Sequence, residues 1–331
     1  MESIVIRKPR DIVLTERDIP EPGPKEVQIK VMASGICGTD VHIFRGEYLG
    51  SYPVIPGHEF SGVVTAVGSQ VTRFKIGDRV AVEPNIACDN CSECLNNRQN
   101  FCLNWQAVGV TLPGGMEQYT LAPEKAVFDI GDLPFDQAAF MEPLSCVIHG
   151  IERTHIELAD QVAILGAGPI GNLMLQLARL QGAAHVTMLE SNPGRVELAR
   201  QLGADLVVTK LDDLKLNTYD VVIDATGVIP VMERSIHFVR NGGTVLLFGV
   251  PPSDKNIELE AFKIFQKGLT ILSSYTSVRN SYQAVGLLQS GEVKVSPLIS
   301  HHLPLKELPQ ALEMIETHDP TVKKVIMLPN G

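Results

Sequence analysis

Hydrophobic and polar residues follow two different patterns in two parts of this chain. Up to about residue 130, short apolar runs broken by Gly, Pro and Asp predict β-strands within 27–37, 60–71 and 78–83. From residue 161 onward, short apolar strands such as 161–165 alternate with segments of helical spacing such as 169–182. Strands that alternate with helices indicate βαβ units and a parallel sheet.

The C-terminal part does not continue the βαβ pattern. Apolar spacing predicts helices over 281–291 and 308–318, with strand-like segments between and after them. We expect this tail to return to the first domain. The predicted division is one domain of residues 1–147 plus 281–331 and an inserted domain of residues 148–280.

Composition restricts the classes of protein to which the chain can belong. It has 331 residues, of which 44% are apolar and 20% charged, and a net charge of −10. An acidic chain without a Lys/Arg cluster lacks the basic surface that nucleic acid binding requires. No apolar run reaches the ~18 residues of a membrane span, and charge interrupts the N-terminal segment too early for a signal peptide. We therefore expect a cytoplasmic protein with no membrane or nucleic acid partner.

Four of the six cysteines lie in one short run. Cys88, Cys91, Cys94 and Cys102 have the spacing Cys-x2-Cys-x2-Cys-x7-Cys. In a reducing compartment such thiols are expected to bind a metal rather than form disulfides. Four thiolates complete the tetrahedral shell of zinc and leave no position for a substrate, so the run predicts a structural zinc. Free or redox-active cysteines and an iron–sulfur cluster are the alternatives.

A second set of metal-binding residue types is scattered along the chain. Cys37 begins the segment CGTDVH, and His58 and Glu59 lie in the segment GHE. A mixed Cys/His/Glu set drawn from distant segments can leave a coordination position open, as in a catalytic zinc site. Each of these residues alone could equally be structural. On the residues alone Glu142 would not be chosen to complete the set, and Cys146, four residues on, is a competing choice that could equally be a buried thiol of a helix.

A glycine-rich turn follows the strand predicted at 161–165. The six residues from Gly166 to Gly171 read Gly-Ala-Gly-Pro-Ile-Gly and open a helix. In such a motif Gly166 allows the tight turn, Gly168 lets a pyrophosphate approach the backbone, and Gly171 permits close packing of helix on strand. The motif predicts a dinucleotide site. A glycine turn in a sheet that binds no nucleotide is the alternative.

An acidic residue at the end of the next strand indicates which dinucleotide would bind. Glu190 lies 24 residues beyond Gly166, near the spacing of about 20 expected for a carboxylate that binds the ribose. Such a carboxylate accepts hydrogen bonds from the ribose hydroxyls and repels a 2′-phosphate, which favours NAD over NADP. Arg195 argues the other way, because an Arg near this point could receive the phosphate.

With these motifs in hand, the chain resembles the zinc-containing medium-chain dehydrogenases over essentially its whole length. The segments that carry the resemblance are CGTDVH, PGHEFSGVV, the four-cysteine run, GAGPIG, VVIDATG and GGTVLLFGV, in family order. The resemblance implies an α/β fold in which a Rossmann domain with a doubly wound parallel sheet is inserted in a GroES-like, β-rich catalytic domain. It looks closest to the polyol (sorbitol-type) branch, because Glu142 stands where simple alcohol dehydrogenases carry a cysteine.

The resemblance also implies roles for particular residues. Cys37 and His58 would bind a catalytic zinc, Glu59 would bind it or stand just behind it with a catalytic role, and Glu142 would bind directly or through water. The structural zinc would be held by Cys88, Cys91, Cys94 and Cys102, which makes two zinc ions per chain.

Further roles follow for residues close to these ligands and for the cofactor site. Thr39 would take the proton of the alcohol, His42 would deliver it to solvent, and Asp40 would orient His58. The residues expected to bind NAD are Gly166, Gly168, Ile170, Gly171, Glu190, Arg195, Thr226, Gly227, Gly249 and Val250, of which the last four would flank the nicotinamide.

The activity that the resemblance implies is the reversible oxidation of a secondary alcohol in a polyol to a ketose, with hydride transfer to NAD. A 3-hydroxy amino acid, a sugar phosphate or a simple alcohol is the alternative substrate. Sorbitol itself is not expected, because Ser274 stands before Tyr275 where sorbitol-type enzymes carry an Arg. The family forms dimers and tetramers, so a homodimer or homotetramer is expected, and the strand at 244–250 could pair across a dimer edge.

Overall fold

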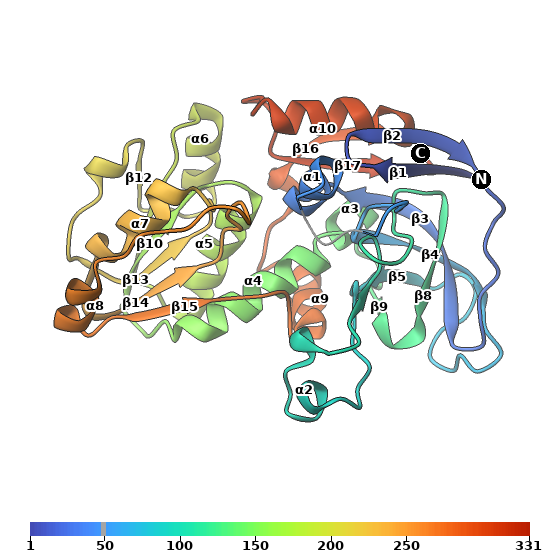
Figure 1. Ribbon diagram of the computed structural model, residues 1–331, viewed down its shortest axis with the longest axis horizontal. Coiled ribbons are helices and arrows are strands. Elements are labelled where there is room, and N and C mark those ends of the chain that lie inside the picture. The colour runs from blue at the N-terminus through green and yellow to red at the C-terminus, as the bar shows by residue number, and fades with distance from the viewer. Residues whose placement is uncertain (48–50) are drawn as a thin grey trace. The chain divides into compact units, whose positions relative to one another are not determined.

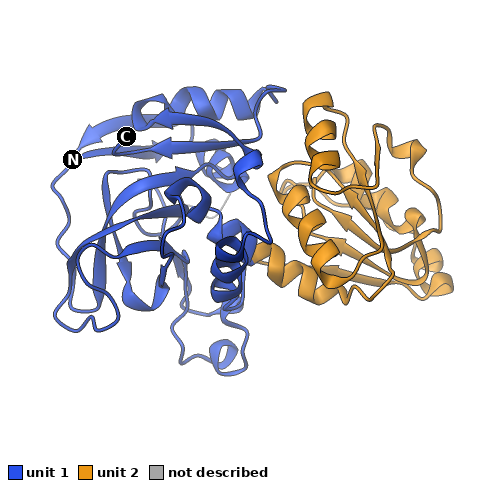
Figure 2. Ribbon diagram, turned by 180° about the vertical axis from the view of Figure 1, so that it is seen from behind, with its two compact units in different colours: residues 1–145, 277–331 blue, residues 146–276 orange. Residues whose placement is uncertain are grey.

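The computed structural model describes residues 1–47 and 51–331, and these residues form two compact units (Figure 2). Unit 1 comprises residues 1–145 and 277–331, and unit 2 comprises residues 146–276. The chain therefore leaves the first unit, builds the second and returns, as the sequence predicts for an inserted α/β domain. No helix in the described ranges is long and apolar enough to cross a membrane.

Unit 1 is built on a seven-stranded sheet, and the strands expected at 27–37, 60–71 and 78–83 are β3, β4 and β5 within it. Along β3 the side chains of Val27, Ile29 and Val31 are buried at every second position, because alternate residues of a strand face the same side. The strands of this unit are β1 (Glu2–Lys8), β2 (Asp11–Glu16), β3 (Glu26–Gly35), β4 (Glu59–Val67), β5 (Arg79–Val82), β6 (Asn85–Ile86), β7 (Gln106–Ala107), β8 (Tyr119–Pro123), β9 (Val127–Asp129), β16 (Ile299–Pro304) and β17 (Lys324–Leu328).

The C-terminal segment completes this sheet. The order of strands is β16-β17-β3-β4-β5-β9, with β8 also paired to β3, so the last strand of the chain lies beside β3. The helices of unit 1 are α1 (Gly38–Arg45), α2 (Ser92–Leu95), α3 (Phe135–Ala138), α9 (Ser281–Ser290) and α10 (Leu308–Glu316), with 3-10 turns η1 (Gln99–Phe101), η2 (Glu124–Ala126), η4 (Ser296–Leu298) and η5 (Leu305–Glu307). Helix α4 (Met141–Thr154) begins in unit 1 and ends in unit 2.

Unit 2 contains a six-stranded parallel sheet in the order β12-β11-β10-β13-β14-β15 (Figure 1). The chain runs outward from β10 in one direction and then in the other, which is the doubly wound order of a Rossmann domain and places helices on both faces. The elements are β10 (Gln161–Leu165), α5 (Pro169–Gln181), β11 (His185–Leu189), α6 (Pro193–Gln201), β12 (Leu206–Val208), η3 (Leu211–Asp213), β13 (Tyr219–Asp224), α7 (Ile229–Phe238), β14 (Val239–Leu247), α8 (Ala261–Lys267) and β15 (Thr270–Ser273).

The strand order decides which segments can bind a ligand and which can meet another subunit. The strand order reverses between β10 and β13, so the loops that follow these two strands lie at the point where such sheets bind nucleotides.

The expectation that residues 244–250 could pair across a dimer edge is wrong. They belong largely to β14, whose two sides are hydrogen-bonded to β13 and β15.

The N-terminal hairpin of β1 and β2 is tied to the body of unit 1 by a buried carboxylate. Ser3 donates a 3.0 Å hydrogen bond to Oε2 of Glu117, and Nη1 of Arg17 lies 3.4 Å from the same oxygen. Glu117 is only 1% exposed, and burial raises the pKa of its carboxyl from 4.5 to about 7. The folded protein therefore holds a proton at Glu117 up to about pH 7, whereas the unfolded chain releases it near pH 4.5.

This proton makes the contribution of Glu117 to stability pH-dependent. It is fully present below pH 4.5 and is lost as the pH rises through about 7. Glu117→Gln mimics the protonated form. We expect it to match the wild type near pH 4.5 and to be more stable at pH 8, by at most about 3 kcal/mol. Urea unfolding of both proteins at the two pH values measures this difference. An equal difference at both pH values would contradict the role of the buried proton.

Candidate metal and cofactor sites

The four cysteines of the short run converge on one point in unit 1. Cys91 is the N-cap of α2, Cys94 lies within this helix, and Cys102 follows η1. The Sγ–Sγ distances are 3.5 Å for Cys91 and Cys94, 3.9 Å for Cys91 and Cys102, and 4.0 Å for Cys88 and Cys94. Four sulfurs at 2.3 Å from a tetrahedral zinc lie about 3.8 Å apart, so the spacing of these thiols fits zinc.

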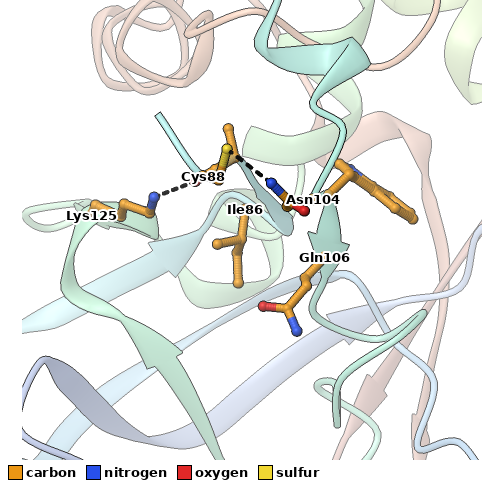
Figure 3. Close-up of a pocket in the computed structure, with 7 residues that line it drawn as sticks. Ile86, Cys88, Asn104, Gln106 and Lys125 are labelled. Atoms are coloured by element: carbon orange, nitrogen blue, oxygen red, sulfur yellow. Dashed lines mark hydrogen bonds between the residues drawn. The ribbon is translucent and has the colours of Figure 1, made fainter. Parts of the chain in front are cut away.

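Amide groups favour the thiolate forms of Cys88 and Cys91, whereas burial and the neighbouring thiols raise the pKa of Cys94 to about 12. The backbone amide of Cys88 donates to Sγ of Cys102 at 3.2 Å. The side-chain amide of Asn104 points at Sγ of Cys88 at 3.7 Å (Figure 3). The pKa of Cys88 is lowered to about 6, first by the backbone amide of Asn90 and then by Asn104. A thiolate is the form of cysteine that binds metal, so this environment suits a cation.

Cys37, His58 and Glu59, which lie in two separate segments, are brought together in unit 1. Cys37 is the N-cap of α1, and His58 and Glu59 lie where β4 begins. One potential ligand atom of each residue lies within 4.8 Å of the others. Burial would lower the pKa of His58, but the carboxylate of Asp40 and the thiol group of Cys37 raise it well above its usual value. The negative charge that stabilises the imidazolium would equally attract a divalent cation.

Asp40 contacts both the segment that contains Cys37 and the segment that contains His58. Its Oδ2 accepts a 2.8 Å hydrogen bond from the backbone amide of Cys37, and its Oδ1 accepts one of 3.2 Å from Gly57. The same Oδ1 lies 3.5 Å from Nδ1 of His58. Burial would raise the pKa of Asp40, yet His58 and these hydrogen bonds lower it, so the carboxylate is charged. The position suits the orienting role that the family resemblance implies for Asp40.

Lys324 is a residue of this site that sequence reasoning missed. It begins β17, is buried, and forms an ion pair with the carboxylate of Glu59. A Cβ on Gly35 of β3 would lie 2.5 Å from Oε2 of Glu59 and 2.9 Å from Cε of Lys324, so only glycine leaves room for this pair. Burial would lower the pKa of Lys324, but Glu59 and then Cys37 raise it. Nothing in the sequence near Lys324 distinguishes it from a surface lysine.

The structure does not bring Glu142 into the group formed by Cys37, His58 and Glu59. Glu142 lies in the first turn of α4 and is buried. Among the described residues, however, the mixed cluster of ligand atoms within 4.8 Å contains only the other three. Cys146, which competed with Glu142 in the sequence, lies on the same helix and also stays outside the cluster.

Thr39 and His42 both lie on α1, shortly after Cys37. They are three residues apart on a helix, so their side chains project from the same face. Both side chains are partly exposed, as a proton path from a buried site to solvent requires.

The glycine-rich turn in unit 2 has the geometry of a dinucleotide cradle. Gly166 has φ 104°, and a Cβ on Gly171 would lie 1.9 Å from the carbonyl oxygen of Gly166. Gly168 is the N-cap of α5, and a Cβ there would meet nothing within 4 Å. The fold therefore requires glycine at positions 166 and 171. Gly168 borders open space at a helix N-terminus, where an anion is favoured. Ile170 lies in the first turn of the same helix.

Glu190 follows β11 and lies beside this turn. Its Oε2 accepts a 3.3 Å hydrogen bond from the backbone amide of Ala167, and its Oε1 accepts one of 2.9 Å from Asn192. Nη1 of Arg195 lies 3.9 Å from Oε2 of Glu190. The carboxylate and the guanidinium are thus close enough that either could meet the ribose end of a dinucleotide.

Asp224, the last residue of β13, organises the other side of the cradle and was also missed in the sequence. Its Oδ1 accepts from the hydroxyl of Thr226 at 2.6 Å, and its Oδ2 accepts from the amide of Gly227 at 3.1 Å. Close packing joins this loop to the one after β14, because a Cβ on Gly249 would lie 2.0 Å from the amide nitrogen of Gly227 and one on Gly227 would lie 2.4 Å from the carbonyl oxygen of Val250. The signal was present in VVIDATG, where an acid ends an apolar strand.

Comparison with protein families matches both parts of the chain. Residues 23–132 match the family described as "Alcohol dehydrogenase GroES-like domain", and residues 169–290 match the one described as "Zinc-binding dehydrogenase".

Characterised relatives cover most of the chain. D-altritol 5-dehydrogenase of Agrobacterium fabrum is 38% identical over 89% of this chain and 90% of that protein. D-arabinitol dehydrogenase 1 of Uromyces fabae is 33% identical over 100% of this chain and 97% of its own length. L-threonine 3-dehydrogenase of Deinococcus radiodurans is also 33% identical, over 91% and 90%.

Solved structures share the whole fold. A putative zinc-binding dehydrogenase from Sinorhizobium meliloti 1021 bound to NADP is 34% identical and has a TM-score of 0.94, with 99% of each chain covered. A protein from Escherichia coli CFT073 described as a short chain alcohol dehydrogenase, complexed with NADH, is 29% identical and has a TM-score of 0.92, again with 99% of each chain covered.

Proposed function

The chain belongs to the zinc-binding alcohol dehydrogenase family and is an oxidoreductase, and on that premise we propose that it oxidises a secondary alcohol of a polyol to a ketose, reversibly, with NAD as the hydride acceptor. The observation that carries the proposal is the gathering of Cys37, His58 and Glu59 within 4.8 Å. Three protein ligands of this kind leave a fourth position of a tetrahedral zinc for a substrate oxygen.

The residues present fit both metal ions and the cofactor. Cys37, His58 and Glu59 would hold a catalytic zinc, and Glu142, which lies outside their cluster, would act through water. The four-cysteine run would hold a second, structural zinc. A catalytic zinc supplies Lewis-acid chemistry that makes an alcohol proton easier to remove, and NAD accepts the hydride.

The chain's own groups would bind, orient and move the proton. Asp40 would orient His58, and Lys324 would hold Glu59 and balance its charge in a buried place. Thr39 would take the proton of the substrate hydroxyl, and His42, one turn further along α1, would pass it to solvent. The two histidines have different roles in this proposal because His58 is buried, whereas His42 is partly exposed and can reach solvent.

The polyol class is supported by the relatives and by Glu142. Three relatives are named for polyols: D-altritol 5-dehydrogenase, D-arabinitol dehydrogenase 1 and a sorbitol dehydrogenase of Bacillus subtilis are 38%, 33% and 32% identical. Ser274, which replaces the Arg expected in a sorbitol-type enzyme, lies with its hydroxyl 3.2 Å from Nδ1 of His149. A short hydroxyl there offers a substrate less charge and less reach than a guanidinium. We therefore expect a polyol other than sorbitol.

A substrate panel tests this proposal. NADH formation is followed at 340 nm with several polyols, a polyol phosphate, L-threonine and simple alcohols, and NADP is measured alongside NAD. We expect the highest kcat/KM with a polyol and a preference for NAD, because Glu190 repels a 2′-phosphate. Activity confined to simple alcohols or to L-threonine would overturn the polyol assignment. A preference for NADP would instead indicate that Arg195 receives the 2′-phosphate of the cofactor.

Assembly can be measured on the same preparation. We propose a homodimer or homotetramer, whose mass light scattering determines. The edge strands of the described sheet in unit 2 are β12 and β15 rather than β14, so any pairing of sheets between subunits would use Leu206–Val208 or Thr270–Ser273.

A further inference from the structure

The C-terminal end of α1 places an acidic residue against His42. The helix ends at Gly46, which has φ 83° and on which a Cβ would lie 2.7 Å from Cγ of Pro9, so glycine is required there. The chain then folds back, and the backbone amide of Glu47 donates a 2.8 Å hydrogen bond to the carbonyl oxygen of His42. A glycine C-cap in the left-handed conformation is a common way for a helix to terminate. Here it fixes the backbone of Glu47 about one helical turn after His42.

The side chains of the same two residues also meet. Oε2 of Glu47 lies 2.8 Å from Nδ1 of His42, which is the distance of a hydrogen bond. The His42 side chain is 25% exposed and that of Glu47 is 47% exposed. Two contacts, one between backbones and one between side chains, therefore hold Glu47 to His42.

The other charged groups around this pair do not compete for the ring. Nη1 of Arg45 lies 3.9 Å from Oε2 of Glu47, and Nε of Arg45 lies 2.7 Å from Oε1 of Glu316 on α10. Asp40, the other acid of α1, is engaged with Cys37, Gly57 and His58. Among the residues that the structure describes, Glu47 is thus the one carboxylate paired with His42.

We propose that Glu47 is a positioning residue that sets the tautomer of His42. A carboxylate can only accept, so the proton on the neutral ring stays on Nδ1 and the lone pair stays on Nε2. Nε2 is then the atom that receives a proton from the Thr39 side and later releases it to water. Glu47 itself is not protonated at any step. The inference rests on the proton path of the proposed function and adds to it the group that orients the base.

The decisive test is the tautomer of His42, measured without turnover. The protein is labelled with ¹³C and ¹⁵N in histidine, and His42→Ala identifies the resonance among the nine histidines. We expect Nδ1–H in the wild type. In Glu47→Gln, whose amide can donate as well as accept, we expect loss of this single tautomer. Glu47→Asp keeps the carboxylate and should restore Nδ1–H at least in part.

Kinetics provide a second readout. Glu47→Gln should lower kcat/KM for the polyol about 3- to 10-fold at neutral pH, less than the 10- to 100-fold typical of groups that orient catalytic ligands, because the pair is half exposed. Glu316→Gln is the matched control: it removes a carboxylate that contacts Arg45 but not His42. It should change neither the tautomer nor the rate.

Different outcomes contradict different parts of the proposal. An unchanged His42 tautomer in Glu47→Gln overturns the inference, and a rate loss of the same size in Glu316→Gln assigns the effect to surface charge instead. If His42→Ala keeps full activity, the proton path in the proposed function is wrong, even where the tautomer measurement succeeds. Thermal melting of each variant separates these results from a loss of fold.

Discussion

Replacing Cys37 with serine should lower kcat by at least about 10³-fold while the protein remains folded. A neutral hydroxyl is a poor ligand for zinc, and the Lewis acid contributes several kcal/mol to the reaction, where each 1.36 kcal/mol is a factor of ten in rate. The fold should survive, because Cys37 is the N-cap of α1 and serine is among the residues preferred at that position.

Zinc content and activity are measured together to check this result. We expect the Cys37→Ser protein to lose about one zinc per chain and to keep its melting temperature within a few degrees. Cys146→Ser is the control, since Cys146 lies outside both groups of ligands, and it should retain zinc and activity. Full activity in Cys37→Ser would show that catalysis does not depend on a metal bound by Cys37.

Replacing Cys91 with serine should have the opposite profile, a large loss of stability. Two of the large apolar residues of this segment, Leu95 and Leu103, are each 71% exposed, so the segment has little apolar core of its own. The folded conformation of this segment therefore depends on the four cysteine sulfurs being held together. Structural zinc contributes about 10 kcal/mol or more to the folding of small zinc domains. Even a fraction of that would lower the melting temperature by about 10 °C.

The measurement is scanning calorimetry with zinc analysis, and the matched control is Leu95→Ala. That substitution lies in the same segment, removes an exposed side chain and leaves the sulfurs intact, so the melting temperature should change little. If Cys37→Ser and Cys91→Ser destabilise the protein equally, the division into one catalytic and one structural site is wrong.

Features whose parts lie close together in the chain could be predicted from the sequence. The four cysteines span residues 88–102, so a few turns bring their sulfurs to the observed 3.5–4.0 Å. The turn from Gly166 to Gly171 follows a strand and opens α5 as predicted, because a strand, a turn and a helix N-terminus are local structures. The alternation of strands and helices likewise predicted the parallel sheet of unit 2.

Contacts between distant segments depended on the order and register of strands. Lys324 meets Glu59 because β17 lies on one side of β3 and β4 on the other, with Gly35 between them and too small to separate the two side chains. The sequence shows these three residues but not that order. The sequence likewise does not show how near Glu142 lies to the other candidate ligands. The family resemblance assigned it to the metal, but in the structure it lies outside the cluster of Cys37, His58 and Glu59.

The sequence by itself therefore determined the chemistry available to this protein, namely a run of four thiols, a mixed Cys/His/Glu set and a glycine-rich turn of the dinucleotide type. Only the tertiary structure decided which distant groups complete them: Lys324 against Glu59, Asp224 beneath Thr226 and Gly227, and Glu47 against His42. The physical reason is that spacing along the chain restrains neighbours within a turn or two. Pairs between separate strands and loops are set by packing and by which strands share an edge.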